Sequence, residues 1–337
     1  MKIALSGYFG FKNTGDEAIL LAMRDGIREI LPETRISVLD QPNRFNLRMI
    51  ADCDLLISGG GGLLQDKTST RSFLYYLGII RLAKLLGKKV FIFAQGIGPI
   101  SKWYNRLLLK RVLNKVDLIT VRDLNSFNFL KSLKLQNPKI VETADPTFVL
   151  TPEDGEKILK IEGLLDSKPR IGICLRKNQQ SQKIAAVCKK LIEKLGAQII
   201  FIPFQLPYDL SPSQDILNQI DKNACMIFRE MHPREVLGVI SRLDLLIGMR
   251  LHSLIFAVNS LVPAVGLSYD PKVASFMGEI DLPCIDIDDL EVENLLSAVL
   301  ELWDNRTGVK HSLESHRRKL RAQSRLNFGL IRMLKGE

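Results

Sequence analysis

Short apolar runs rich in β-branched residues alternate with helical patterns along almost the whole chain. This alternation predicts βαβ units and parallel sheets, whose strands are buried on both faces and therefore lack polar positions. The runs form two series. The first comprises Ile3–Leu5, Ile36–Leu39, Leu55–Ser58, Val90–Ala94, Leu118–Val121 and Ile140–Glu142. The second comprises Ile171–Leu175, Ile199–Ile202, Met226–Phe228, Leu245–Gly248, Ala264–Leu267 and Cys284–Asp286. We therefore predict an α/β protein of two doubly wound, Rossmann-type domains.

The length of 337 residues fits two domains, and a polar, proline-containing stretch around 151–169 separates the two series. We predict an N-terminal domain over 1–165, a C-terminal domain over 166–311 and a basic helix over 312–337. Leucines at 313, 320, 326, 330 and 334 can share one face of that helix, which can pack back across both domains. Ligands bind beyond the carboxyl ends of the strands in such sheets, so we expect the site in a cleft between two facing domains.

The net charge of +10 is unevenly distributed. From Lys310 to Glu337 there are eight Lys/Arg and two Glu, a net +6, and we read the rest of the chain as only mildly basic. This argues against a nucleic-acid-binding protein. The basic segment is either a solvated helix face or a surface that touches anionic lipid or an acidic partner.

The five cysteines form no C-x-x-C pair, which predicts neither a disulfide framework nor a metal site and favours a reducing compartment. The first apolar stretch is too short for a signal peptide. The longest apolar region, 243–267, contains Asp244, Arg250, His252 and Asn259, so it is no membrane span. We expect a cytoplasmic protein that can sit at the inner face of the cytoplasmic membrane.

Two glycine-rich loops follow predicted strands in the first half. Residues 7–17 (GYFGFKNTGDE) lead into a helix predicted over Glu17–Leu31, with Thr14 or Asp16 as its cap. The loop lacks the G-x-G-x-x-G spacing of a dinucleotide site, so it is either a ligand loop or an ordinary strand-to-helix turn.

The second loop has four successive glycines, Gly59 to Gly62. Consecutive glycines are costly in entropy and a plain turn needs one or two, so we expect a ligand to approach the backbone here. No G-K-[ST] follows. A glycine shelf without lysine suits a sugar or a lipid-linked diphosphate as well as it suits phosphate.

Polar residues follow further strands of this half. Gln95 can donate to and accept from hydroxyl groups. Arg122-Asp123 and Asp145-Pro146 are each either functional or an ordinary salt bridge or turn. Polar, glycine-rich loops at several strand ends of one half point to a polyhydroxyl ligand.

The second half instead carries cations after its strands. Arg176 follows the predicted strand Ile171–Leu175, and Lys272 follows the predicted strand Ala264–Leu267. Arg250 and His252 follow the predicted strand Leu245–Gly248. A lone arginine in apolar sequence is usually paired to an aspartate, but three cations at one sheet edge with few nearby acids favour an anion site. His252 is a general acid/base, a hydrogen-bond donor to an anion, or simply a histidine that begins a helix.

Several motifs recur in one order from residue 7 to about 272. They are Gly7-Tyr-Phe-Gly, Asn13-Thr-Gly-Asp-Glu17, Ser58-Gly-Gly-Gly-Gly62, Gln65-Asp66, Ala94-Gln-Gly-Ile-Gly-Pro99, Val121-Arg-Asp123, Ala144-Asp-Pro146, Gly248-Met-Arg-Leu-His252 and Tyr269-Asp-Pro-Lys272. Each is weak alone. In combination the chain resembles the polysaccharide pyruvyl transferase family, and most closely its bacterial cell-wall branch.

The resemblance implies a GT-B-like fold, phosphoenolpyruvate as donor, and a cyclic pyruvate ketal on a sugar as product. In the cell-wall branch the acceptor is a lipid-linked disaccharide containing N-acetylmannosamine, and the finished polymer anchors S-layer proteins. By the resemblance the donor-binding residues would be Arg250, Leu251, His252 and Arg176, where Arg176 is matched by strand position alone. From the pattern of cations after the strands we add Lys272. The acceptor-binding residues would be Asn13, Asp16, Gly60, Gly61, Gly62, Asp66 and Gln95.

The residues fit this chemistry independently, because phosphoenolpyruvate carries a carboxylate and a phosphate that several cations can bind. Arg250 and His252 are the predicted catalytic residues, and Asp16 is a second candidate base. No cofactor is expected, because an enol phosphate is already activated.

Two other functions compete with this one. The first is a GT-B glycosyltransferase that uses a nucleotide sugar. Many such enzymes bind ribose through a glutamate in the donor domain, but Leu251–Leu267 contains no acid. The second is a non-catalytic sugar-binding or scaffold protein, against which the cationic strand ends argue.

Overall fold

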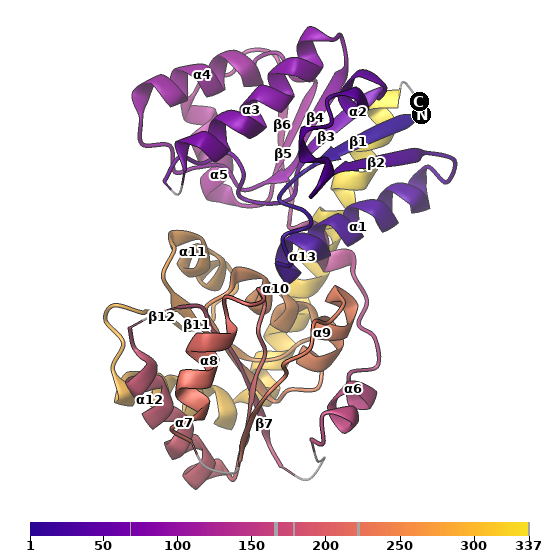
Figure 1. Cartoon of the computed structure of the whole chain (residues 1–337). Helices are drawn as coiled ribbons and strands as arrows, with labels where there is room; N and C mark the ends of the chain where they lie inside the picture. The colour runs from indigo at the N-terminus through magenta and orange to yellow at the C-terminus, as the bar shows by residue number, and fades with distance from the viewer. Residues whose placement is uncertain (68, 165–167, 178, 221–222, 336–337) are drawn as a thin grey trace. The chain divides into compact units, whose positions relative to one another are not determined.

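The computed structural model describes residues 1–337 except 68, 165–167, 178, 221–222 and 336–337 (Figure 1). The chain divides into two compact units. Unit 1 comprises Met1–Phe11, Asp16–Val149 and Leu320–Glu337, and unit 2 comprises Lys12–Gly15 and Leu150–Lys319. The main division therefore falls after Val149, earlier than the predicted boundary at 165.

Unit 1 contains a six-stranded parallel sheet in the order β2-β1-β3-β4-β5-β6. Its strands are β1 Lys2–Ser6, β2 Arg35–Leu39, β3 Leu55–Gly59, β4 Lys89–Gln95, β5 Leu118–Val121 and β6 Lys139–Glu142. Its helices are α1 Thr14–Ile30, α2 Arg48–Ala51, α3 Thr70–Leu85, α4 Trp103–Leu113 and α5 Leu124–Ser132.

Successive strand residues of unit 1 point to opposite faces of the sheet, and each face has its own core. Ile3 and Leu5 pack with α1 and the end of the last helix, whereas Ala4 between them packs with α3 and α4. The strands are apolar at both kinds of position because helices cover both faces. This explains why the sequence shows continuous apolar runs.

Unit 2 repeats the architecture with the order β12-β11-β10-β7-β8-β9. Its strands are β7 Arg170–Cys174, β8 Gln198–Phe201, β9 Ala224–Met226, β10 Leu245–Gly248, β11 Ala264–Ser268 and β12 Cys284–Asp286. Its helices are α6 Gly155–Ile161, α7 Ser181–Leu195, α8 Leu210–Leu217, α9 Pro233–Ile240, α10 Leu251–Asn259, α11 Pro271–Glu279 and α12 Val292–Asp304. Every predicted strand is present, although β9 begins two residues before the predicted Met226.

The last helix, α13 (Arg306–Lys335), begins before the predicted residue 312 and contributes to both units. Leu313 and Leu320 are buried as predicted, but Leu326 is exposed. Asn327 and Phe328 lie on the buried face instead, with Phe328 packing edge-on against Phe93 at 5.3 Å between ring centroids. The leucine pattern missed this because Asn327 is a polar residue with buried partners in unit 1.

Candidate active site

The switch point of the unit 2 sheet brings several predicted donor residues to one edge. The chain builds the sheet outward from β7 in one direction and from β10 in the other, and such a reversal creates the crevice in which doubly wound sheets bind ligands. Arg176 follows β7, and Arg250 and His252 follow β10. The sequence could not show that these two strands are neighbours.

Arg250 is held by an aspartate that the sequence analysis did not identify. Nε of Arg250 lies 3.1 Å from one carboxylate oxygen of Asp209, and Nη2 hydrogen-bonds the other. Asp209 is buried and also accepts the N–H groups of Phe204 and Gln205 at 3.1 and 2.9 Å. The prediction of cations with few nearby acids is therefore wrong for Arg250, because β8 and α8 bring Asp209 to this edge from 41 residues away.

This pairing fixes the guanidinium in one orientation. A bidentate arginine–carboxylate pair uses one edge of the planar fork and leaves further N–H donors for another acceptor. The pair also reduces the positive charge available to an anion. Arg250 is thus a fixed hydrogen-bond fork more than an isolated charge.

The other two predicted cations lie after β7 and β11. Cζ of Arg176 lies 4.2 Å from the ring centroid of Tyr269, which follows β11. Stacking on an aromatic face holds a guanidinium in place. Lys272 lies in the first turn of α11, where its backbone N–H donates to the capping Asp270 at 3.0 Å.

His252 lies in the first turn of α10 and packs against the backbone of Gly15. A β-carbon added at Gly15 would come within 2.2 Å of Nδ1 of His252. Gly15 is held in unit 2 because the N–H of neighbouring Thr14 donates to the carbonyl of Phe204 at 2.7 Å. The glycine of the Asn13-Thr-Gly motif therefore makes room for the imidazole.

Asn13, a predicted acceptor residue, has a structural contact. Its Oδ1 accepts the N–H of Gly15 at 3.0 Å at the start of α1. Asn13 thus takes the capping position predicted for Thr14 or Asp16, and α1 begins at Thr14 rather than at Glu17.

In unit 1 the switch point lies between β1 and β3, and it brings Asp16 next to the glycine shelf. Oδ1 of Asp16 is 3.4 Å from the position that a β-carbon of Gly61 would occupy. The first turn of α1 and the loop after β3 therefore lie side by side, and an acceptor role of Asp16 and Gly61 stays a prediction.

Two glycines of the shelf are required by the backbone conformation and by packing within unit 1. Gly59 and Gly60 have φ values of +151° and +84°, which side chains rarely adopt. An added β-carbon would be 2.1 Å from the carbonyl oxygen of Phe93 at Gly59, and 2.0 Å from Ile19 at Gly60. Close packing thus accounts for these two glycines, so the inference that four glycines require a ligand is wrong for them. A ligand contact at Gly60, Gly61 and Gly62 stays a prediction.

Gln95 hydrogen-bonds the shelf. Its Nε2 donates to the carbonyl of Gly61 at 2.7 Å, and the N–H of Gly96 donates to the same oxygen at 2.9 Å. Among the described residues, Oε1 of Gln95 is buried without a hydrogen-bond partner. The amide thus fixes the shelf and retains one acceptor for a hydroxyl or N–H group.

A buried network connects the backbone beside Gln95 to α13. The N–H of Ala94 donates to Oγ1 of Thr120 at 2.7 Å, and that hydroxyl donates to Oδ1 of Asn327 at 2.6 Å. The hydroxyl of Thr143 donates to the same Oδ1 at 2.9 Å, and Nδ2 of Asn327 donates to the carbonyl of Ala144 at 3.1 Å. The C-terminal helix therefore supports the ends of β4 and β5 beside Gln95.

Asp66, predicted to bind the acceptor, anchors the start of α4. Its carboxylate accepts the N–H groups of Ser101 and Lys102 and Nδ2 of Asn105 at 2.7, 3.2 and 2.8 Å. Burial alone would raise the pKa of Asp66, but these hydrogen bonds and the charge of Lys102 outweigh burial and lower its pKa below the usual value. An acceptor contact of Asp66 stays a prediction.

The acids of the Arg122-Asp123 and Asp145-Pro146 pairs make structural contacts. Arg122 and Asp145 form a buried ion pair with 2.5 Å between Nη1 and Oδ2, next to Gly96. Asp123 caps α5 by accepting the N–H of Ser126 at 2.7 Å. Of the alternatives that the sequence left open, the salt bridge and the capped turn are present.

Sequence reasoning also missed a cation beside the acceptor loops. Cζ of Arg44 lies 4.2 Å from the ring centroid of Tyr75 and 5.5 Å from that of Phe11. Neighbouring Tyr76 is buried, which raises the pKa of its hydroxyl, and its hydroxyl donates to the carbonyl of Gly7 at 3.3 Å. No local sequence motif marks Arg44, because the aromatic rings that it contacts come from α3 and from the loop after β1.

Comparison with protein families decides the assignment. The family model of polysaccharide pyruvyl transferases matches residues 13–271, from Asn13 through the unit 2 switch point. The chain belongs to the polysaccharide pyruvyl transferase family. It is also 23% identical over 287 residues to the amylovoran biosynthesis protein AmsJ of Erwinia amylovora, covering 77% of this chain and 68% of that protein.

This pyruvyl transferase also resembles solved structures of other proteins in fold. The UDP-GlcNAc 2-epimerase of Neisseria meningitidis has a TM-score of 0.68 at 14% identity, with all of both chains covered. HepE of Anabaena, solved with UDP and glucose, has a TM-score of 0.62 at 11% identity, again with all of both chains covered. These likenesses confirm the two-Rossmann, GT-B-like fold that the sequence predicted.

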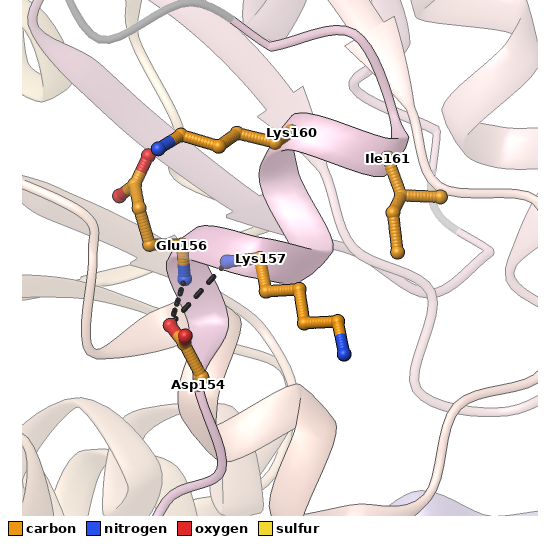
Figure 2. Close-up of a pocket in the computed structure, with 5 residues that line it drawn as sticks. All are labelled: Asp154, Glu156, Lys157, Lys160 and Ile161. Carbon is orange, nitrogen blue, oxygen red and sulfur yellow. Dashed lines mark hydrogen bonds between the residues drawn. The ribbon is translucent and has the colours of Figure 1, made fainter.

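The described part of the pyruvyl transferase also has a hollow away from both switch points. A shallow hollow at α6 is lined by Asp154, Glu156, Lys157, Lys160 and Ile161 (Figure 2). Asp154 there caps its own helix, accepting the N–H groups of Glu156 and Lys157, as the dashed lines in Figure 2 mark.

The described part of the chain shows neither a metal cluster nor a membrane span. No group of three or more histidines, cysteines or acids could hold a metal ion, and all five cysteines are free thiols. Nor does any helix in this part combine the length and apolarity that crossing a bilayer requires.

Proposed function

We propose that this transferase moves the enolpyruvyl group of phosphoenolpyruvate onto a sugar, forms a cyclic pyruvate ketal and releases phosphate. The observation that carries the proposal is the arrangement at the unit 2 switch point. There a carboxylate-fixed Arg250, a ring-stacked Arg176 and His252 follow adjacent strands. The family membership supports pyruvyl transfer as the reaction.

The donor has two anionic groups, and the chain offers two different kinds of cation for them. In the proposal the remaining N–H donors of Arg250 bind the phosphate, and Arg176 binds the carboxylate or shares the phosphate. Lys272, at the neighbouring strand end, adds a point charge. Donors fixed before the reaction stabilise charge that develops on the departing phosphate, because they need not reorganise.

The proposed chemistry needs one proton on carbon and two sugar hydroxyls. An acid protonates the methylene carbon of the donor, and C2 becomes oxocarbenium-like. One hydroxyl adds to C2, phosphate leaves with the C2–O bond electrons, and a second hydroxyl closes the ketal. His252 supplies or holds a proton, and Asp16 is the candidate base toward the acceptor. No cofactor enters these steps.

For the acceptor we propose a lipid-linked saccharide containing N-acetylmannosamine, the precursor of a cell-wall polymer that anchors S-layer proteins. Asn13, Asp16, the Gly60–Gly62 shelf, Asp66 and Gln95 are the proposed acceptor residues, and the buried acceptor atom of Gln95 supports a polar ligand. Arg44 adds a cation that suits a diphosphate. This reaction would take place in the cytoplasm, at the inner membrane face.

The test is phosphate release from phosphoenolpyruvate, with and without a synthetic disaccharide diphospholipid containing N-acetylmannosamine. Acceptor-dependent release supports the proposal. UDP-sugar consumption without phosphate release would instead make the protein a nucleotide-sugar glycosyltransferase, with Arg250 and His252 as diphosphate ligands.

The histidine is tested by His252→Ala. We expect turnover to fall by about two to four orders of magnitude with the fold intact, because a positioned general acid/base contributes about that much. The exposed His311→Ala variant is the matched control. Turnover equal to wild type in His252→Ala would remove this imidazole from the mechanism.

A further inference from the structure

The largest concentration of positive charge lies outside the C-terminal helix. From Lys67 to Val116 the chain contains eleven Lys/Arg and no Asp or Glu. The chain outside 310–337 as a whole is only mildly basic, at a net +4, but its positive charge is concentrated in this run. Counting charge over the whole chain hid the run, because acidic stretches elsewhere offset it.

The acids that flank this run are already engaged inside unit 1. Asp66 accepts hydrogen bonds at the start of α4, as described above. Asp117 accepts Nζ of Lys84 at 2.8 Å and the N–H of Val90 at 2.7 Å. Neither flanking carboxylate is available to neutralise the remaining cations of the run.

The run spans α3, β4 and α4, and the two helices pack side by side on one face of the unit 1 sheet (Figure 1). A groove of about 440 Å³ lies between their outer faces, and its cations are Arg81 and Lys84 on α3 and Arg111 on α4, with Lys115 just beyond. Its apolar wall is formed by Leu85, Leu108 and Val112. The groove is thus lined by both basic and apolar side chains.

The same two helices expose an unusual number of large apolar side chains. They are Leu74, Leu85 and Leu86 on or directly after α3, and Trp103, Tyr104 and Leu107 on α4. Trp103 is 75% exposed and Leu85 70%. Exposed apolar side chains in this number mark an interaction surface, since scattered single residues would need no explanation.

We propose that this α3–α4 face docks on an anionic phospholipid surface. Cations flanking exposed Trp, Tyr and Leu side chains are the pattern of an interfacial membrane element, in which aromatic rings enter the headgroup region and Lys/Arg contact lipid phosphates. The run contains no acid over fifty residues, so its cations are spread over two helices. Cations spread in this way suit an extended negative surface better than a single small anion. The inference is independent of the proposed reaction, because lipid alone is the ligand.

This membrane-docking face differs from the surface that the sequence suggested for anionic lipid, which was the basic C-terminal helix. There Arg317 and Arg318 both bind Glu314, at 2.7 and 2.8 Å, and the apolar residues Phe328 and Ile331 are buried in unit 1. Its cations are thus partly compensated and its main apolar side chains are used internally. The α3–α4 face has both components exposed together.

Flotation of the full chain with vesicles tests the proposal. We expect binding at low salt to vesicles of phosphatidylcholine with phosphatidylglycerol, and little to phosphatidylcholine alone. The groove variant Arg81→Gln/Arg111→Gln/Lys115→Gln should lose roughly a hundredfold in partitioning, at about fivefold per cation. The matched tail variant Lys310→Gln/Lys319→Gln/Arg325→Gln should bind like wild type.

The only two tryptophans provide a second readout. In a Trp303→Phe background, Trp103 emission should shift to the blue on anionic vesicles and be quenched by brominated lipid. In a Trp103→Phe background, Trp303 of unit 2, whose ring stacks with Arg306, should not respond. Circular dichroism of each variant checks that it is folded.

Three outcomes would overturn the inference. The first is no binding to phosphatidylglycerol vesicles at low salt, which would leave an acidic protein as the occupant of the face. The second is loss of binding in the tail variant with retention in the groove variant. The third is unshifted Trp103 emission in vesicle-bound protein. None of these results bears on phosphate release in solution, so the proposed reaction is tested separately.

Discussion

At the residue scale, the chemistry depends on side chains that are fixed by distant partners. Arg250 is fixed by Asp209, Arg176 by Tyr269, and His252 packs on Gly15. Each of these pairs is distant in sequence and adjacent at the edge of the unit 2 sheet. Two predictions follow from the closeness of the contacts.

The first prediction concerns Gly15→Ala. The added methyl group would lie 2.2 Å from Nδ1 of His252, so the imidazole has to turn away. We expect turnover to fall roughly a hundredfold, the cost of a displacement of about 1 Å in a catalytic group. Gly78→Ala in α3, where an added β-carbon meets nothing within 4 Å, is the control. Steady-state kinetics at equal folded fraction measures both, and wild-type turnover in Gly15→Ala would contradict the prediction.

The second prediction concerns the pair Asp209 and Arg250. Arg250→Lys should raise the donor KM by roughly tenfold or more, because an ammonium cannot replace a planar fork. Asp209→Asn should act in the same direction, because it leaves the guanidinium without its carboxylate. In a double-mutant cycle the two losses should not add, since both act through one group. Additive losses would show that Asp209 does not position Arg250.

At the element scale, acids that belong to the ordered motifs also begin helices. Asp66 anchors α4, Asp123 caps α5 and Asp270 caps α11. A residue after a strand is also a residue before a helix in these sheets, so the same position serves a ligand or a cap. The pattern of residue types cannot separate the two roles, and the contacts can.

Asp66 gives a pH-dependent prediction. Its pKa is lower in the folded state than the ordinary value of 3.8, so the ionised carboxylate stabilises the fold above that pH. The stabilisation is lost as pH falls through the folded-state pKa. Asp66→Asn should therefore unfold at lower denaturant concentration than wild type near neutral pH, by roughly 1–3 kcal/mol.

The difference between wild type and Asp66→Asn should narrow as pH drops below about 4. Urea unfolding across pH measures it. The exposed Asp215→Asn in α8 is the matched control, and a difference that stays constant down to acidic pH would contradict the role of the ionised carboxylate.

At the scale of the whole molecule, one helix takes part in both compact units. The first part of α13 belongs to unit 2 and its last part to unit 1, where Asn327 and Phe328 are buried. A chain ending at Lys319 should therefore lose amide-exchange protection in β4 and β5 and keep it in β7 and β10. Removing Phe328 and Ile331 exposes the apolar face of the unit 1 sheet, at about 2 kcal/mol for each side chain.

Hydrogen exchange followed by mass spectrometry measures this prediction. Asn327→Ala in the full chain is the milder variant, because it removes the buried hydrogen bonds to Thr120, Thr143 and Ala144 and keeps the apolar contacts. Full protection of β4 and β5 in the truncated chain would show that unit 1 does not need the helix.

The sequence by itself determined the class of fold, the strands and the family. Strand positions were predictable because a buried parallel strand needs a continuous apolar run, and the ordered motifs marked the switch-point loops of both units. The tertiary structure alone decided which of those residues meet. Asp209 beside Arg250, Gly15 beneath His252 and Asn327 behind Thr120 are separated by tens to hundreds of residues, so no local pattern relates them. The positive charge of α3 and α4 differs from these contacts, because the acid-free run is visible in the sequence. Only the packing of both helices on one face of the sheet brings their cations together into one surface.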